Sequence, residues 1–405
     1  MAPRLPYDVL REIFRHLDPV PDNDSIKLIT TPSSSLAIQR SNGAIISRIS
    51  HEWRDLGYRM MFSNVLLQLG YEKHQRKMIL LTGNEEIAKN VKRLFISATE
   101  HDWERLQSLP IDFLLPSLSN LERLEIVSPW PVILKVFSQV DFSPNGDLRN
   151  LRHLVLDNSG RDAIRDPVDL TRLVSKLPHL VSLEINTPLA ETGTMPPSPE
   201  TRIESRPLRH LKSLDYTVQY RGPTTLAVPL FLTLWNLLDP SKLEHLSLSD
   251  RTLPETLPSI LTSCPNLSTL SLSCDRQTTE LQLPSLIETL YSLPKLTRLD
   301  LSLVPDWTAP FHVPSTSPLP SQLFSALSSL PHLESASFDL DLSFHEPATQ
   351  AYLASQWSTG TLKRFRWNSW LAVARNRVSV EYERIEEGGW RREEMGNSFE
   401  IVGAD

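Results

Sequence analysis

The chain has 405 residues, 40% of them hydrophobic, which is enough for one long core or for several domains. Its net charge of −7 and isoelectric point near 5.9 give no general electrostatic argument for nucleic-acid binding. Only two cysteines, Cys264 and Cys274, are present, so we expect neither a disulfide framework nor a metal site. Both cysteines are expected to be in a reducing compartment. The amino-terminal text lacks the apolar region of a signal peptide, and the longest apolar run is too short for a bilayer, so we expect an intracellular protein without a membrane segment.

The first segment predicts two amphipathic helices. After Pro6 and before Pro19, the apolar residues of the first helix recur at helical spacing. The second helix lies within residues 45–61 and contains Trp53. The sequence motif L-P-x-x-V-L-x-x-I-F-x-x-L-D-P, followed by W-R-D-L, resembles an F-box over roughly residues 4–61. We place the domain that contains it at residues 1–61. A polar insertion at about 20–35 departs from the family pattern.

In F-box proteins, such a small helical domain docks on a Skp-type adaptor of a cullin–RING ubiquitin ligase. The resemblance therefore implies adaptor-binding roles for the motif residues Leu5, Pro6, Val9, Leu10, Ile13, Phe14, Leu17 and Trp53. The alternative is that these residues pack only against one another or against the segment that follows. Fewer than sixty residues make a thin core, which favours burial against a partner.

Residues 62–90 are expected to connect this domain to the repeats that follow and to cap the N-terminal end of those repeats. The alternation over 62–69 predicts a strand, and residues 77–90 are expected to form a helix.

From residue 91 to 370 one hexad, L-x-x-L-x-L, recurs about every thirty residues. The period-two leucines of each hexad predict a short strand with one buried face. Apolar residues at i, i+3, i+4 and i+7 between the hexads, as in Leu170–Leu177 and Leu323–Leu330, predict a helix in most units. This pattern resembles a leucine-rich repeat protein. It implies an α/β solenoid of about ten units, with parallel strands on a concave face and helices on a convex face. An ordinary doubly wound α/β domain is the alternative.

Two insertions interrupt the repeats, at 187–206 and 304–320, and both are predicted to be loops. Residues 371–405 are predicted to form a strand cap and a tail. Val378–Arg384 reads as one strand, Gly388-Gly389 as a turn, and Ser398–Val402 as a second strand.

No catalytic or metal-binding motif is apparent, so we expect neither an enzyme nor a cofactor. The residues between the repeat leucines should face outward from the strands and offer a polar surface to a protein. The candidate target-binding residues are Arg123, Glu125, His153, Glu184, Asp215, His245, Arg298, Asp300, Arg364 and Arg366. The alternative is a solvated sheet face that has no single partner.

Together the two resemblances imply a substrate-recognition subunit of an SCF-type ubiquitin ligase, cytoplasmic or nuclear. Its partners would be the Skp-type adaptor, the cullin scaffold and an unknown target protein, with no nucleic acid and no membrane. The runner-up is a leucine-rich-repeat scaffold whose F-box has decayed and which acts outside a ligase. A hydrolase or transferase with an unrecognised site is a third alternative.

Overall fold

The computed structural model describes residues 59, 61–102, 106–107, 109–143, 145–158, 167–189, 208–220, 231–232, 234–249, 257–275, 286, 288–304, 319–339, 353, 361–371, 376–384 and 390–395. It divides the chain into an N-terminal unit, Met1–His153, and a C-terminal unit, Leu154–Asp405. Nearly all of the predicted F-box-like domain lies outside the described residues, and so do its eight predicted adaptor-binding residues.

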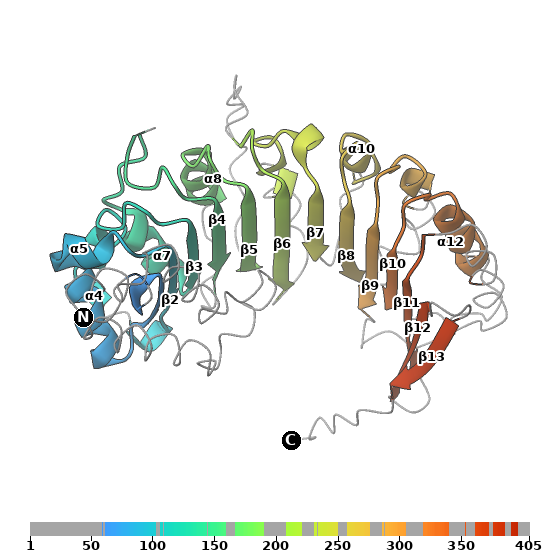
Figure 1. The fold of residues 1–405 in the computed structure, drawn as a ribbon, viewed down its shortest axis with the longest axis horizontal. Coiled ribbons are helices and arrows are strands. Elements are labelled where there is room, and N and C mark those ends of the chain that lie inside the picture. The colour runs from blue at the N-terminus through green and yellow to red at the C-terminus, as the bar shows by residue number, and fades with distance from the viewer. Residues whose placement is uncertain are drawn as a thin grey trace, which may run out of the picture. The chain divides into compact units, whose positions relative to one another are not determined.

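The N-terminal unit is built on the parallel strands β1 (Asn64–Gln68), β2 (Arg93–Ser97) and β3 (Arg123–Val127), which lie in the sheet in chain order (Figure 1). Its helical segments are α4 (Glu72–Gly83), α5 (Glu85–Ala88), η2 (Glu100–Asp102), η3 (Ile111–Phe113) and α7 (Trp130–Phe137). The buried leucine and isoleucine residues of the strands share a core with the apolar face of α7, where Ile133 and Val136 are buried. The predicted strand at 62–69 is confirmed by β1.

The helix predicted at 77–90 is wrong in its bounds, because α4 begins five residues earlier and ends at Gly83. Two contacts hold this early start against β1. The Gln68 amide donates to Nδ1 of His74 at 2.7 Å, and Nε2 of Gln75 donates to the Leu69 carbonyl at 2.8 Å. Extended Asn84 then breaks the helix, and its side chain accepts a hydrogen bond from the Ile87 amide at 3.1 Å, which caps α5.

The C-terminal unit is a mostly parallel sheet with helices, and its strands also follow one another in chain order (Figure 1). The parallel strands are β4 (His153–Asp157, which begins at the last residue of the N-terminal unit), β5 (Ser182–Leu189), β6 (Ser213–Tyr220), β7 (His245–Ser249), β8 (Thr269–Asp275), β9 (Arg298–Val304), β10 (Ser335–Asp339) and β11 (Arg364–Leu371). Between them are α8 (Pro167–Ser175), η4 (Pro240–Lys242), α10 (Leu257–Thr262) and α12 (Leu319–Ser328). Helical returns are described for several of these units, and the expected α/β architecture with stacked parallel strands is confirmed at this level.

The predicted loops are shorter than expected at their edges. Strand β5 continues through Thr187–Leu189, β9 includes Val304, and α12 begins at Leu319. The C-terminal cap is an antiparallel addition to β11, formed by β12 (Asn376–Arg384) and β13 (Trp390–Met395). The second strand of this cap was predicted at Ser398–Val402 but lies at 390–395, and the residues predicted for it lie outside the described part.

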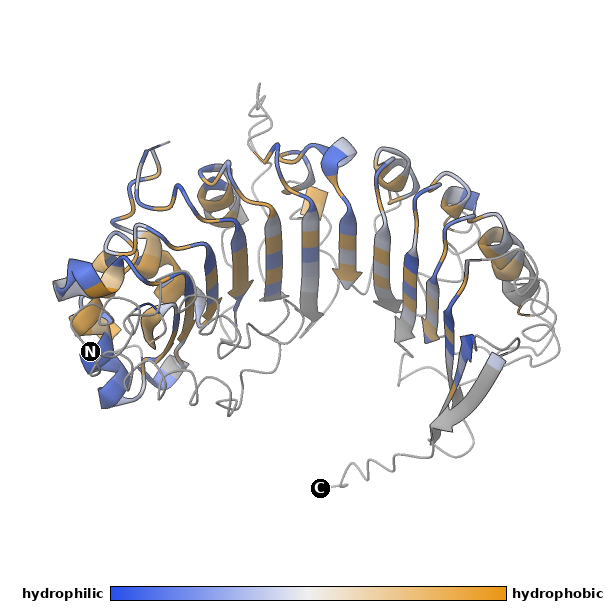
Figure 2. Cartoon of the chain, in the orientation of Figure 1, coloured by the Kyte–Doolittle hydropathy of each residue, from blue (hydrophilic) through white to orange (hydrophobic). Residues whose placement is uncertain are grey.

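Alternation along most of the described strands separates the core from the outward face, and Figure 2 shows it as bands of opposite hydropathy, whereas in β4 the outward Val155 is also buried. In β7, for example, Leu246 and Leu248 are buried between half-buried neighbours. At the far end of the C-terminal unit aromatic residues replace the leucines. The ring of Phe324 in α12 lies 6.1 Å from the rings of Phe365 and Trp367 in β11, so α12 packs on the buried face of that strand.

One hydrogen-bond pattern recurs where each parallel strand begins. The amides of Glu122 and Arg123 both donate to the Lys92 carbonyl, at 2.8 and 3.0 Å. In the C-terminal unit the amides of Glu334 and Ser335 donate to the Thr297 carbonyl in the same way, at 2.7 and 3.0 Å. Equivalent residues of successive units are thus held at one fixed register.

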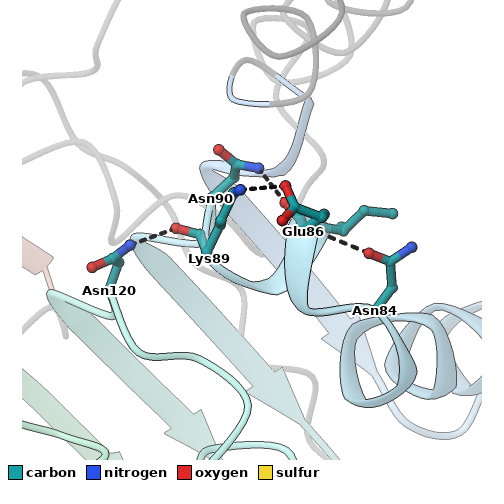
Figure 3. Close-up of polar contacts among 6 residues, drawn as sticks. Asn84, Glu86, Lys89, Asn90 and Asn120 are labelled. Atoms are coloured by element: carbon teal, nitrogen blue, oxygen red, sulfur yellow. Dashed lines mark hydrogen bonds and ion pairs between the residues drawn. The ribbon is translucent and has the colours of Figure 1, made fainter.

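Asparagines just before the first repeat leucine add a side-chain ladder. Nδ2 of Asn90 bonds locally, donating to the Glu86 carbonyl four residues earlier at 2.7 Å, whereas Nδ2 of Asn120 donates to the Lys89 carbonyl of the preceding unit at 2.8 Å (Figure 3). Equivalent bonds run from Asn150 to the Ser119 carbonyl and from Asn266 to the Ser241 carbonyl. These amides satisfy turn carbonyls that the strand ladder does not reach.

Candidate functional site

The candidate site is the face of each sheet opposite the leucines. Strand register places equivalent outward residues side by side in rows, because parallel neighbours pair hexad to hexad. All ten predicted target-binding residues occupy these outward positions, and each is either half-buried or exposed. They do not form one uniform surface, and their charges differ between the two units and along the second.

In the N-terminal unit the first outward row is basic. Arg93 and Arg123 are direct register partners in β2 and β3. His153 follows, and its amide donates to the Glu122 carbonyl at 3.1 Å. Burial lowers the pKa of His153, and the charges of Arg123 and Arg93 lower it further, so its imidazole is neutral at pH 7.

The second row of the same unit mixes apolar and acidic groups. Leu66, Phe95 and Glu125 are register partners across β1, β2 and β3. Nη2 of Arg123 lies 3.8 Å from Oε2 of Glu125, at the outer limit for an ion pair, and the two side chains are 19% and 16% exposed.

The C-terminal unit begins with an acidic section. Glu184 and Asp215 are register partners in β5 and β6. In the next outward row, Nδ2 of Asn186 donates to Oδ2 of Asp157 at 3.1 Å. Burial raises the pKa of Asp157, and the Asn186 hydrogen bond opposes that rise.

Small hydroxyl side chains dominate the middle of this unit, over β7 to β10. Register pairing aligns them in rows beside His245, and all are half-buried: Ser247, Ser249, Thr269, Ser271, Ser273, Ser302, Ser335 and Ser337. Short side chains of this kind offer many donors and acceptors, and the charges among them include those of Arg298 and Asp300 in β9.

The arginines at the far end pair with carboxylates inside the protein. Nε of Arg298 lies 2.8 Å from Oδ2 of Asp300. Both Nε and Nη2 of Arg366 donate to Oε2 of Glu381 in β12, at 3.2 and 2.6 Å. Arg364 lies 3.6 Å from Glu383 in the same strand. Arg298 is therefore paired within its own strand, and the charges of Arg364 and Arg366 are neutralised by the C-terminal cap.

One outward residue was missed in the sequence analysis. Arg93 belongs to the weakest hexad copy, Val91/Leu94/Ile96, and occupies the position that Arg123 occupies in the next unit. Applying the outward-position rule to that weak copy is the signal that would have found it.

In the part of the chain that the structure describes, few features indicate a catalytic or metal-binding site. No group of three or more His, Cys, Asp or Glu residues there is arranged to hold a metal ion. Cys264 is buried, and burial raises the pKa of its thiol to about 11, which keeps the nucleophilic thiolate scarce. Among the described helices, none has the length and apolar character needed to cross a bilayer.

Comparison with models of known protein families gives no match for this chain, and neither does a search of curated proteins.

Proposed function

We propose that the chain is an F-box protein of the leucine-rich-repeat class, a non-catalytic subunit that recognises substrates for an SCF-type ubiquitin ligase. In this proposal the F-box-like segment at 1–61 docks the Skp-type adaptor, and the outward sheet faces hold a target protein. Ubiquitin transfer then follows from proximity, because the target is held close to the active site of a partner.

The observation that carries the protein-binding part is the set of outward rows. Parallel strands in fixed register present charged and hydroxyl side chains at regular spacing on a rigid sheet. A rigid surface with separate acidic, hydroxyl and basic sections favours selective recognition, because it costs little ordering on binding and rejects partners of like charge. The hexads, the helical returns in the described part of the chain and the parallel order support the leucine-rich-repeat class.

The proposal that the chain is a ligase subunit rests on the F-box-like sequence motif between Leu5 and Trp53. Capture of the purified full chain by an immobilised Skp-type adaptor tests it. Leu10→Asp and Ile13→Asp each introduce a carboxylate on the apolar helical face, so we expect either change to reduce capture at least about tenfold. The matched control is Arg15→Ala, which also lowers the net charge by one unit but lies on the side of the predicted helix opposite the apolar stripe, and should bind as wild type.

Wild-type chain that is folded by circular dichroism but is not captured by the adaptor would contradict the ligase proposal. It would favour the runner-up, a repeat scaffold that binds proteins outside a ligase. Equal loss of capture in the Arg15→Ala control would show that the predicted apolar helical face does not specify the contact.

A further inference from the structure

The outer face of helix α4 is apolar at a place where a repeat protein normally ends in polar residues. Met78 and Leu81 are buried, whereas Ile79 and Leu80, the apolar pair, lie on the opposite side of the helix and are 53% and 43% exposed. In the described part of the chain, four of the five exposed large hydrophobic side chains belong to the N-terminal unit. Because the end of a repeat array needs a polar surface, the apolar pair indicates that one more layer covers α4.

The rest of this face leaves the apolar pair open to a neighbour. Glu72 and Arg76, on the same face, form an ion pair with each other at 2.5 Å. Gly83 follows about one turn after the apolar pair, and a Cβ atom built on it would meet nothing within 4 Å. A second helix can therefore approach this end of α4 closely, because glycine adds no side chain at the contact.

The chain that enters β1 is placed to supply the missing layer. Residues 61 and 62 are helical, and the Ser63 amide donates to the Arg59 carbonyl at 2.9 Å, so a helix ends where β1 begins. Strands β1 and β2 are parallel, so α4 and α5 run from the far end of β1 back to the edge where both strands begin. The apolar pair, in the second half of α4, therefore lies toward the edge at which the preceding helix enters.

The sequence of that preceding helix complements the apolar pair. Its apolar residues recur at spacings of three and four and form one stripe: Ile46, Ile49, Trp53, Leu56 and Met60. A helical stripe of this length extends about 21 Å and α4 about 18 Å, so the one can lie along the other.

We propose that residues 46–60 form the outermost helix of the repeat array and pack this stripe on Ile79 and Leu80. Trp53 then contacts α4 and positions the F-box-like segment, rather than contacting the adaptor. The adaptor contact is thereby confined to the first predicted helix, Leu5–Leu17, and this part of the inference rests on the proposed function. The packing on α4 does not depend on it.

Hydrogen exchange of the full chain, followed by mass spectrometry, tests the contact. In the wild-type protein the amides of residues 46–58 should be protected, because their opening requires loss of the packing on α4. Leu80→Asp places a carboxylate in that contact and should speed their exchange at least about tenfold. The matched control is Tyr291→Asp, which makes a similar change at a side chain that is 50% exposed in the C-terminal unit and should leave the exchange unchanged.

Trp53→Ala should also speed exchange of residues 46–58, because it removes the largest side chain of the stripe. Combined with Leu80→Asp, it should give exchange no faster than that of the faster single variant, since both changes break one contact. Multiplied effects would show that the two residues do not touch and would overturn the proposal. Rapid exchange of residues 46–58 in the wild type, or no effect of Leu80→Asp, would overturn it as well.

Adaptor capture of the same proteins separates this inference from the ligase proposal. Leu80→Asp should be captured as wild type, and Leu10→Asp should lose capture while residues 46–58 stay protected. Wild-type protein that protects residues 46–58 but is not captured would contradict the ligase proposal and still support the packing on α4. Loss of capture by Leu80→Asp as large as that by Leu10→Asp would place the second helix in the adaptor contact and overturn the role given to Trp53. Dimers of the wild type that Leu80→Asp dissolves would assign α4 to a second copy of the chain and overturn the proposal.

Discussion

At the scale of the residue, Asp157 sits in an unfavourable environment. It is half-buried, its pKa is raised by burial, and it accepts one hydrogen bond from Asn186. Oδ1 of Asn186 is buried with no hydrogen-bond partner among the described residues. An amide at position 157 would remove the buried charge and supply the missing donor.

We therefore expect Asp157→Asn to raise the free energy of unfolding at pH 7 by about 0.5–1 kcal/mol. The folded-state pKa lies above the unfolded value, so the wild-type protein binds more protons when folded. The wild-type protein is therefore less stable at a pH above the folded-state pKa of Asp157 than at a pH below its unfolded-state pKa. The advantage of the variant should shrink as the pH falls through the ordinary carboxyl pKa of 3.8, because the carboxyl then becomes protonated in both states. Urea unfolding at pH 7 and pH 3.5 measures both values, and a gain that persists at the lower pH would contradict this explanation.

Cys264 gives a second prediction at this scale. Its Sγ lies 3.4 Å from the Ile260 carbonyl, and the residue has no exposed surface. In a Cys274→Ser background, alkylation by iodoacetamide at pH 8 should be at least about a hundredfold slower in the folded protein than in urea, because the raised pKa leaves little thiolate. Comparable rates in both states, followed by mass spectrometry, would show that this region opens readily.

At the scale of the element, β12 and β13 close the sheet of the C-terminal unit with antiparallel strands. Without them, the outer edge of β11 would present unpaired amides and carbonyls for association with other chains. The same addition places Glu381 opposite Arg366 and Glu383 opposite Arg364. Capping the edge and neutralising the arginines are therefore consequences of one element.

A double-mutant cycle of Arg366→Ala and Glu381→Ala should give a coupling energy of about 0.5–1 kcal/mol, because two hydrogen bonds join half-buried side chains. The Lys212–Glu244 pair is the control. It lies at a similar distance of 2.7 Å, but both side chains are more than half exposed, so its coupling should be about 0.3 kcal/mol and weaker in salt. Equal coupling in the two cycles would show that the Arg366 pair adds nothing beyond surface electrostatics.

The strands were predictable from the sequence because the leucine hexad is both local and repeated. Even degraded copies, such as Leu362/Phe365/Trp367, fall on a strand. Helix α4 was misplaced because its start depends on contacts of His74 and Gln75 with β1, which the periodicity of α4 itself does not encode. The second cap strand was misplaced because its residues Trp390–Met395 are mostly charged, and charge patterning resembles a loop.

At the scale of the whole molecule, the outward positions of the candidate site were predictable, but their electrostatic state was not. The sequence places Arg364 and Arg366 on the outward face, whereas their neutralisation requires the antiparallel register of β12, which brings residues about fifteen positions away into contact. Conversely, Arg93 stands out only once β2 and β3 are aligned. Predictions of binding charge on a repeated sheet therefore need the pairing register as well as the list of outward residues.

The doubled acceptor at the start of each strand has an evolutionary consequence. Glu244 and His245 share the Lys212 carbonyl, and Ser268 and Thr269 share the Glu244 carbonyl. If a recombination event excised 245–268, Thr269 would follow Glu244 directly, and the new pair of amides would meet the same oxygen of Lys212. Genes for such a chain can thus lose or duplicate one module without creating a mismatched seam, which offers a simple route to homologues of different length.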